Sequence, residues 1–201
     1  MAKRKTLAES NAYEHSKTRG NSWMIDWREL LMLRAFRLLT RLRIDKLLRT
    51  RTQAHAFTDY FRGFEKVEAV REIFGEKSER VLNNLKVEFT WVGGYMWVNG
   101  ANGNLMISSR YLNTGDRTDV YLDLIHELIH VRQFMEGKEL FDIHYGYTER
   151  PTELEAYRHA VQEAKRLGLN DERICRYLKT EWMNDRDFKL LAKTLNIHCS
   201  S

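Results

Sequence analysis

The sequence predicts an α+β fold, in which a small antiparallel three-stranded sheet packs on one helix and on a second helix that follows it. Further helices are expected at both ends of the chain. Three observations favour this class. Short segments with strand patterns lie between residues 85 and 109. An apolar segment, residues 120–134, is long enough for a buried helix. The chain's single proline, Pro151, suits the first turn of another helix.

The three strands are predicted from alternation and from turn residues. Residues 85–92 alternate apolar and polar side chains, as a half-buried strand does. Gly93 and Gly94 can make a tight turn into a second strand, residues 95–98. Glycine and asparagine tolerate positive φ, so residues 99–104 form a strong turn that leads into a third strand, residues 105–109.

An HExxH segment, His126-Glu127-Leu128-Ile129-His130, lies within the apolar stretch. On a helix, the two histidines share one face about 6 Å apart along the axis, so both imidazoles can reach one metal ion. Zinc accepts such nitrogens, and Glu127 is placed beside the metal, where it can take a proton from a water. The apolar flanks predict a buried helix, and buried histidines need partners such as a metal.

A catalytic zinc site needs a third protein ligand. The HExxHxxGxxH arrangement of the metzincins is excluded, because Gln133 and Glu136 occupy the glycine and third-histidine positions. The remaining candidates are His144 and the glutamates of the segment that begins at Pro151. Glu153 and Glu155 lie about 200° apart on a helix, so only one of them should meet the metal.

HExxH followed some twenty residues later by a helical glutamate resembles the gluzincin family of zinc metallopeptidases. Over roughly residues 85–168, the segment Glu153-Leu154-Glu155-Ala156-Tyr157 is similar to the family's Glu-x-x-Ala-Asp or Glu-x-x-Ala-Asn. The resemblance implies Zn²⁺ held by His126, His130 and Glu153, with Glu127 as the base that hydrolyses peptide bonds. Tyr157 departs from the family, because it replaces an acid or amide that often supports a ligating histidine.

The resemblance also raises two open questions about substrate binding. One predicted strand could hold a peptide by β-addition, or the strands could only cover the core. An oxyanion would need a donor. The candidates are His144, Tyr145, Tyr147, Tyr157 and His159. A latent form with an intact but closed site is also compatible with the sequence.

Composition predicts one soluble domain with extensions. The 201 residues are 43% hydrophobic and 30% charged, and no apolar run reaches the 18–20 residues of a membrane span. We expect a flexible basic tail over residues 1–22, a helical region over 23–84, and the domain that carries the HExxH segment over 85–201. Cys175 and Cys199 make no disulfide framework, and no signal peptide is evident, so a cytoplasmic location is expected.

Positive charge is concentrated at the start of the chain. Residues 1–51 hold 13 Lys and Arg against 5 Asp and Glu, whereas the other 150 residues have a net charge of −3. A helix is predicted over residues 23–49, with Arg34, Arg37 and Arg41 in a basic stripe. This stripe could be a solvated face, a contact for nucleic acid or a contact for an acidic membrane surface. The alternative function is therefore a nucleic-acid-associated regulatory or binding protein.

The C-terminal part is predicted to be helical. A helix over residues 152–167 should end at Gly168. Asn170 and Asp171 can cap the next helix, to about Thr180, and Asn184 and Asp185 can cap the last, to about Leu195.

Overall fold

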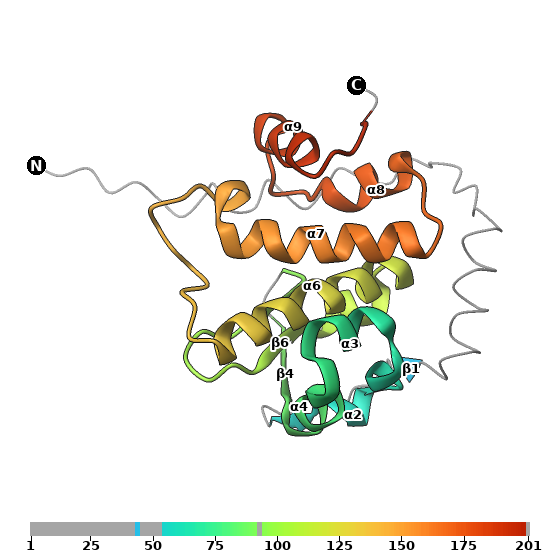
Figure 1. The fold of residues 1–201 in the computed structure, drawn as a ribbon, viewed down its shortest axis with the longest axis vertical. Helices are drawn as coiled ribbons and strands as arrows, with labels where there is room; N and C mark the ends of the chain where they lie inside the picture. The colour runs from blue at the N-terminus through green and yellow to red at the C-terminus, as the bar shows by residue number, and fades with distance from the viewer. Residues whose placement is uncertain (1–42, 45–53, 92–93, 200–201) are drawn as a thin grey trace, which may run out of the picture.

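The computed structural model describes residues 43–44, 54–91 and 94–199, and it has an α+β fold (Figure 1). The predicted tail and most of the predicted helix over 23–49, including Arg34, Arg37 and Arg41, lie outside the described residues. Within that helix prediction, Arg43–Ile44 instead form the short strand β1, which pairs with β3 (Phe61–Arg62). The helix prediction is therefore wrong at this point.

Residues 54–84 are mainly helical, and they supply one wall of the core. Phe57, Phe61 and Phe64 are fully buried there, and their rings pack against one another. The elements of this region are β2 (His55–Ala56), α2 (Phe57–Tyr60), η1 (Phe64–Lys66), α3 (Glu68–Phe74), η2 (Gly75–Lys77) and α4 (Ser78–Asn84).

The main sheet is mixed and has four strands in the order β2-β4-β6-β5. The predicted strands are present as β4 (Lys86–Thr90), β5 (Met96–Val98) and β6 (Leu105–Ser108). The antiparallel three-stranded arrangement is wrong, because β4 pairs parallel to β6 and does not pair with β5. The parallel pairing brings the buried side chains of both strands to the same core, and it leaves β5 as an edge strand.

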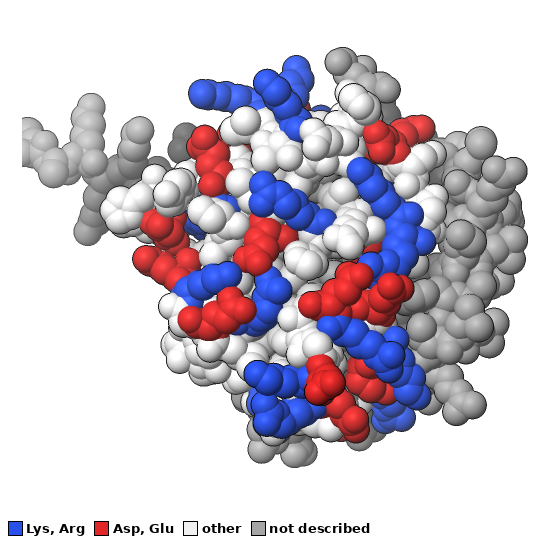
Figure 2. All heavy atoms as spheres, viewed as in Figure 1, with Lys and Arg blue, Asp and Glu red and all other residues white. Residues whose placement is uncertain are grey.

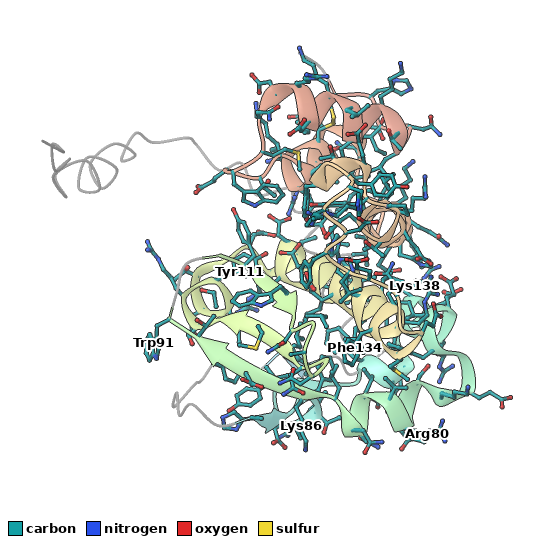
Figure 3. All side chains as sticks on the ribbon, turned by 90° about the vertical axis from the view of Figure 1, so that its left-hand side faces the viewer. Arg80, Lys86, Trp91, Tyr111, Phe134 and Lys138 are labelled. Atoms are coloured by element: carbon teal, nitrogen blue, oxygen red, sulfur yellow. A yellow bond between two sulfur atoms is a disulfide. The ribbon has the colours of Figure 1, made fainter. Side chains whose placement is uncertain are left out.

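The turn between β5 and β6 is confirmed. The backbone N–H of Asn99 donates to the Asn104 carbonyl at 2.9 Å. Gly103 has a φ of 73°, and a Cβ at this position would lie 2.5 Å from the ring of Phe134. The turn therefore packs tightly on the end of helix α6, which Figure 3 shows around the labelled Phe134.

Helix α6 (Arg117–Met135) is the central element of the fold. Its N-cap is Asp116, whose carboxylate accepts the backbone N–H groups of Thr118 and Asp119. Between Val120 and Val131 nearly every side chain is buried, which confirms the predicted buried helix. α5 (Ser109–Thr114) precedes it. In Figure 1, α3 lies on one side of α6 and α7 runs along another.

Three helices follow and confirm the C-terminal predictions. α7 (Pro151–Arg166) begins with Pro151 and is followed by Gly168, whose φ is 79°. α8 (Asp171–Leu178) and α9 (Asp185–Thr194) are capped by the side chains of Asn170 and Asn184. The short helix η3 (Tyr147–Glu149) lies before α7. Figure 1 shows α8 and α9 on the side of α7 away from α6.

The two cysteines are paired, which corrects the prediction made from their number. Cys175 on α8 and Cys199 after α9 form a disulfide, with Cα atoms 5.6 Å apart. They are 24 residues apart in sequence, and only the return of the chain past α9 brings them together. The cytoplasmic location rested partly on unpaired cysteines, and it stays a prediction. Among the described helices, none has the length and apolar character to cross a membrane.

Charges of both signs alternate over the face that Figure 2 shows. Arg166 contacts Glu72 at 2.7 Å and Glu163 at 2.8 Å, and Lys138 contacts Glu136 at 3.0 Å. The net positive charge of the chain comes from residues 1–51, as the charge count indicates.

Candidate metal site

His126, His130 and Glu153 converge at one point between α6 and α7. The two histidine Nε2 atoms are 3.0 Å apart. Oε2 of Glu153 lies 3.3 Å from Nε2 of His126 and 3.5 Å from Nε2 of His130. The spacing of four residues places both histidines on one face of α6, and Glu153 extends toward them from the first turn of α7.

The donor set suits a metal ion of the zinc type. All three side chains are buried, with only 5–6% of each residue exposed. Their potential ligand atoms lie within 4.8 Å of one another, and no other group of this kind occurs among the described residues. Oε2 of Glu153 faces both imidazoles and yet lacks a hydrogen-bond partner. A buried carboxylate oxygen without a donor, beside two imidazole nitrogens, is the arrangement that a cation would complete.

Electrostatics in the site depend on burial and on Glu153. Burial lowers the pKa of His126. Burial acts in the same direction on His130, but contact with Glu153 prevails and raises its pKa to about 9. Burial alone would raise the pKa of Glu153, but the contacts with both histidines hold it well below its usual range. The cluster therefore keeps Glu153 ionised and favours a positive charge beside it, on His130 or on a cation that replaces the proton of His130.

Glu127 is next to His126 and does not belong to the cluster of His126, His130 and Glu153. Burial raises the pKa of Glu127 to about 8, and the nearby His130 opposes this shift. The backbone N–H of Val98 on the edge strand β5 also acts on this carboxyl group and lowers its pKa. The side chain thus lies between the predicted ligands and the edge of the sheet.

Gln133 orients His130 and was not identified from the sequence. Its Oε1 atom lies 2.7 Å from Nδ1 of His130. Its Nε2 donates to the Thr152 carbonyl at 3.0 Å and to Oε2 of Glu155 at 2.8 Å. Glutamine three residues after the second histidine, on the same helix face, was the only available signal.

Glu155 does not contact the predicted ligands, in agreement with the expectation that only one glutamate meets the metal. It forms ion pairs with Arg132 and with Lys138, the latter at 3.4 Å. Together with Gln133, these contacts connect the first turn of α7 to the last turn of α6. Glu155 is therefore a support for the site.

Tyr157 packs against His126. Its ring lies edge-on to that of His126, with centroids 4.5 Å apart. Nδ1 of His126 is buried and has no hydrogen-bond partner within the described part of the chain. Tyr157 thus provides ring packing for His126 and no hydrogen bond to its Nδ1.

Of the other side chains considered from the sequence, only Tyr147 lies at the site together with Tyr157. The hydroxyl groups of the two tyrosines are 3.2 Å apart. His144 is 83% exposed and contacts Asp142 at 2.8 Å. Neither it nor the exposed Tyr145 lines the pocket at the site. His159 is half-buried, nearly two turns beyond Glu153 on α7.

A pocket of about 530 Å³ opens over the cluster. Its walls come from the edge strand β5, from the segment between α6 and α7, and from the site itself. They comprise Met96, Trp97, Val98, His126, Glu127, His130, Leu140, Phe141, Tyr147, Arg150 and Glu153. A ligand in this pocket would therefore contact both the cluster and a free sheet edge.

Comparison of the chain with protein-family models, with curated proteins and with solved structures gives no match. The chemistry of the site must therefore be argued from its own residues.

Proposed function

We propose that this protein is a zinc-dependent peptidase of gluzincin type, with His126, His130 and Glu153 as metal ligands. The observation that carries the proposal is the convergence of these three buried side chains on one point, with Oε2 of Glu153 lacking a hydrogen-bond donor. The resemblance of the HExxH segment and of Glu153-Leu154-Glu155-Ala156 to gluzincins supports the same ligands. Two histidines and one glutamate also leave a fourth position for water or substrate.

When bound, zinc would lower the pKa of a water and polarise the scissile carbonyl. Glu127 is placed to accept the proton of that water and to deliver it to the leaving amine. Burial raises the pKa of Glu127 to about 8, so its carboxylate form is a stronger base than that of an exposed glutamate. Tyr147 lies beside Glu153 in the pocket, and its hydroxyl is the donor best placed to stabilise the oxyanion.

The edge strand β5 supports a peptide as the substrate. Asn99 donates to Asn104 and Ser108 donates to Tyr95, which fixes the hydrogen-bonded pairs between β5 and β6. The alternate residues, Met96 and Val98, therefore direct their backbone groups away from β6. Because the N–H of Val98 acts on Glu127, this edge of the sheet faces the site. An extended peptide could pair with β5 and place its carbonyl near the ligands.

The proposal is tested with the zinc-loaded full chain and a mixed peptide library, with cleavage followed by mass spectrometry. Glu127→Gln should lower the cleavage rate by about 10²–10⁴-fold and leave the zinc content unchanged. Glu136→Gln is the matched control, because Glu136 is an exposed carboxylate at the end of the same helix. Equal cleavage by wild type and Glu127→Gln would contradict the role of Glu127.

A further inference from the structure

A second cleft continues from the candidate metal site toward the other end of α6. It has a volume of about 1000 Å³ and shares Met96, Trp97, His126, Glu127 and Tyr147 with the pocket at the site. We call it the Asp123 cleft, after the acidic residue in its wall. Its remaining lining residues are Gly94, Tyr95, Tyr111, Asp119, Asp123, Tyr157, Arg176, Tyr177, Lys179, Thr180 and Trp182.

Asp123 lies on the same face of α6 as the metal site. It precedes His126 by three residues and Glu127 by four, so its carboxyl group is displaced by about one helical turn, roughly 5 Å along the axis. Its Oδ2 atom accepts the Tyr111 hydroxyl at 2.5 Å. Figure 3 shows Tyr111 where the sheet layer meets the C-terminal helices. A side chain of a bound peptide could thus reach this carboxyl group while the backbone of the peptide lies at the candidate metal site.

The electrostatic surroundings of Asp123 favour the binding of a cation beside its carboxyl group. Burial raises the pKa of Asp123 to about 7, and the nearby Asp119 acts in the same direction. None of the described lysines, arginines or histidines forms an ion pair with Asp123, and Asp119 is already bound to Arg173 at 2.6 Å. A half-buried carboxylate such as that of Asp123 is stabilised by a cation that reaches it. A cationic ligand in the cleft could therefore pair with Asp123, because no described basic residue does so.

A second observation also indicates a ligand. The hydroxyl of Tyr177 is buried in the wall of the cleft, where it interacts with Asp123 and lowers the pKa of that carboxyl group, and only 8% of the residue is exposed. The Thr180 hydroxyl, in the same wall, is buried and has no hydrogen-bond partner within the described part of the chain. Buried hydroxyl groups normally find partners, so an unpaired hydroxyl in this wall suits a ligand that carries hydrogen-bond donors.

The remaining walls are aromatic. Trp97 and Trp182 line the cleft, and Trp182 packs edge-on against Tyr147 with centroids 4.6 Å apart. Tyr95 and Tyr111 form a similar pair at 4.8 Å. Aromatic faces attract cations and contact the methylene groups of long side chains. The two basic residues, Arg176 and Lys179, are exposed, and Lys179 contacts Asp185 at 3.2 Å, so they do not fill the inner part.

We propose that the Asp123 cleft binds the side chain of a lysine or arginine next to the scissile bond, with Asp123 as the anion that receives the cation. The inference rests on the proposed peptidase function and names its substrate class. A long aliphatic stem would lie against Trp97 and Tyr95, and the charged end would meet Asp123 and the Tyr177 hydroxyl.

The test measures binding and needs no cleavage. N-acetyl-lysine amide and N-acetyl-arginine amide are titrated into the full chain, with N-acetyl-norleucine amide as the uncharged ligand and N-acetyl-glutamate amide as the anionic one. Tryptophan fluorescence and calorimetry report binding, with zinc and after its removal. The lysine and arginine ligands should bind at least about tenfold more tightly than norleucine. Equal affinity for lysine and norleucine, or preferred binding of glutamate, would overturn the proposal.

Variants assign the preference to the cleft. Asp123→Asn should abolish the advantage of lysine over norleucine, whereas Glu136→Gln, which removes an exposed charge from the same helix, should keep it. Tyr177→Phe removes only a hydroxyl group and should reduce the advantage even if Asp123→Asn fails to fold. An unchanged preference in a folded Asp123→Asn or in Tyr177→Phe would contradict the assignment. Zinc content is measured separately, so a protein without zinc but with the lysine preference would refute only the peptidase proposal.

Discussion

Oε1 of Gln133 lies 2.7 Å from Nδ1 of His130, one helical turn away on α6. Nε2 of the same amide donates to the Thr152 carbonyl and to Glu155 at the start of α7. The two helices that provide the three candidate ligands are therefore joined by a buried side chain that takes no part in ligation. Groups of this kind fix the orientation of a metal-binding imidazole.

Replacement of Gln133 by leucine should weaken zinc binding without removing a ligand. The loss of the acceptor for Nδ1 of His130 is expected to lower the zinc affinity by about 10–100-fold. Competition with a chelating dye measures the affinity, and Glu136→Gln, at the exposed end of α6, is the control. If Gln133→Leu bound zinc as tightly as wild type, Gln133 would have no orienting role.

The pH dependence of stability should report Asp123. Burial raises its pKa from 3.8 to about 7 in the folded protein. Between these values the folded state keeps a proton that the unfolded state releases, so the free energy of unfolding falls as the pH rises from about 4 to 7. Asp123→Asn should lack this component, which amounts to a few kcal/mol at most, or about 1.4 kcal/mol per pKa unit.

Chemical unfolding of the metal-free protein at several pH values measures this effect. As the pH rises, the unfolding free energy of Asp123→Asn should increase relative to that of the wild type. Asp59→Asn, at an exposed position on α2, is the matched control for the removal of a carboxyl group. Parallel pH curves for Asp123→Asn and wild type would show that the pKa of Asp123 is not raised.

Gly103 should tolerate alanine less well than Gly137. Both have a φ of 73°, so the backbone strain of substitution is matched. A Cβ on Gly103 would meet Phe134 at 2.5 Å, whereas a Cβ on Gly137 would meet nothing within 4 Å. Thermal unfolding should therefore show Gly103→Ala to be less stable than Gly137→Ala by about 1–3 kcal/mol. Equal stability of the two variants would mean that the β5–β6 turn does not pack tightly on α6.

Reduction of the disulfide should lower stability without loss of the site. The pair closes a segment with a sequence separation of 24, which corresponds to about 3 kcal/mol of unfolding free energy. Denaturant unfolding with and without dithiothreitol measures the change, and zinc content should stay the same because neither cysteine lines the pocket. The double variant Cys175→Ser, Cys199→Ser should be insensitive to the reductant. A wild-type protein that is equally insensitive would argue against the pairing.

The sequence predicted the parts of the fold that depend on local patterns. The face shared by His126 and His130 follows from helical geometry. The angular separation of Glu153 and Glu155 predicts that only one of them meets the metal, and the resemblance to gluzincins indicates Glu153. Asn170 and Asn184 cap helices where their residue types predict it.

The features that sequence reasoning missed depend on long-range pairing. Local alternation identifies the strands but does not reveal that β4 pairs with β6 in parallel, because the partner of a strand depends on contacts with segments outside the strand itself. The Cys175–Cys199 pair needs the path of the chain after α9. Gln133 and Asp123 carry no motif, and their importance follows only from what lies opposite them: Glu155 on α7, and Tyr111 with an open cleft.

Metal content tests the central proposal most directly. Elemental analysis of the wild type, Glu153→Ala and Glu155→Ala, each supplied with zinc and then freed of excess, compares a candidate ligand with a supporting residue two positions away. We predict about one zinc per chain for wild type and for Glu155→Ala, and its loss in Glu153→Ala. A wild-type protein that retains no zinc, or a Glu153→Ala protein that retains it fully, would contradict the assignment of His126, His130 and Glu153 as a metal site.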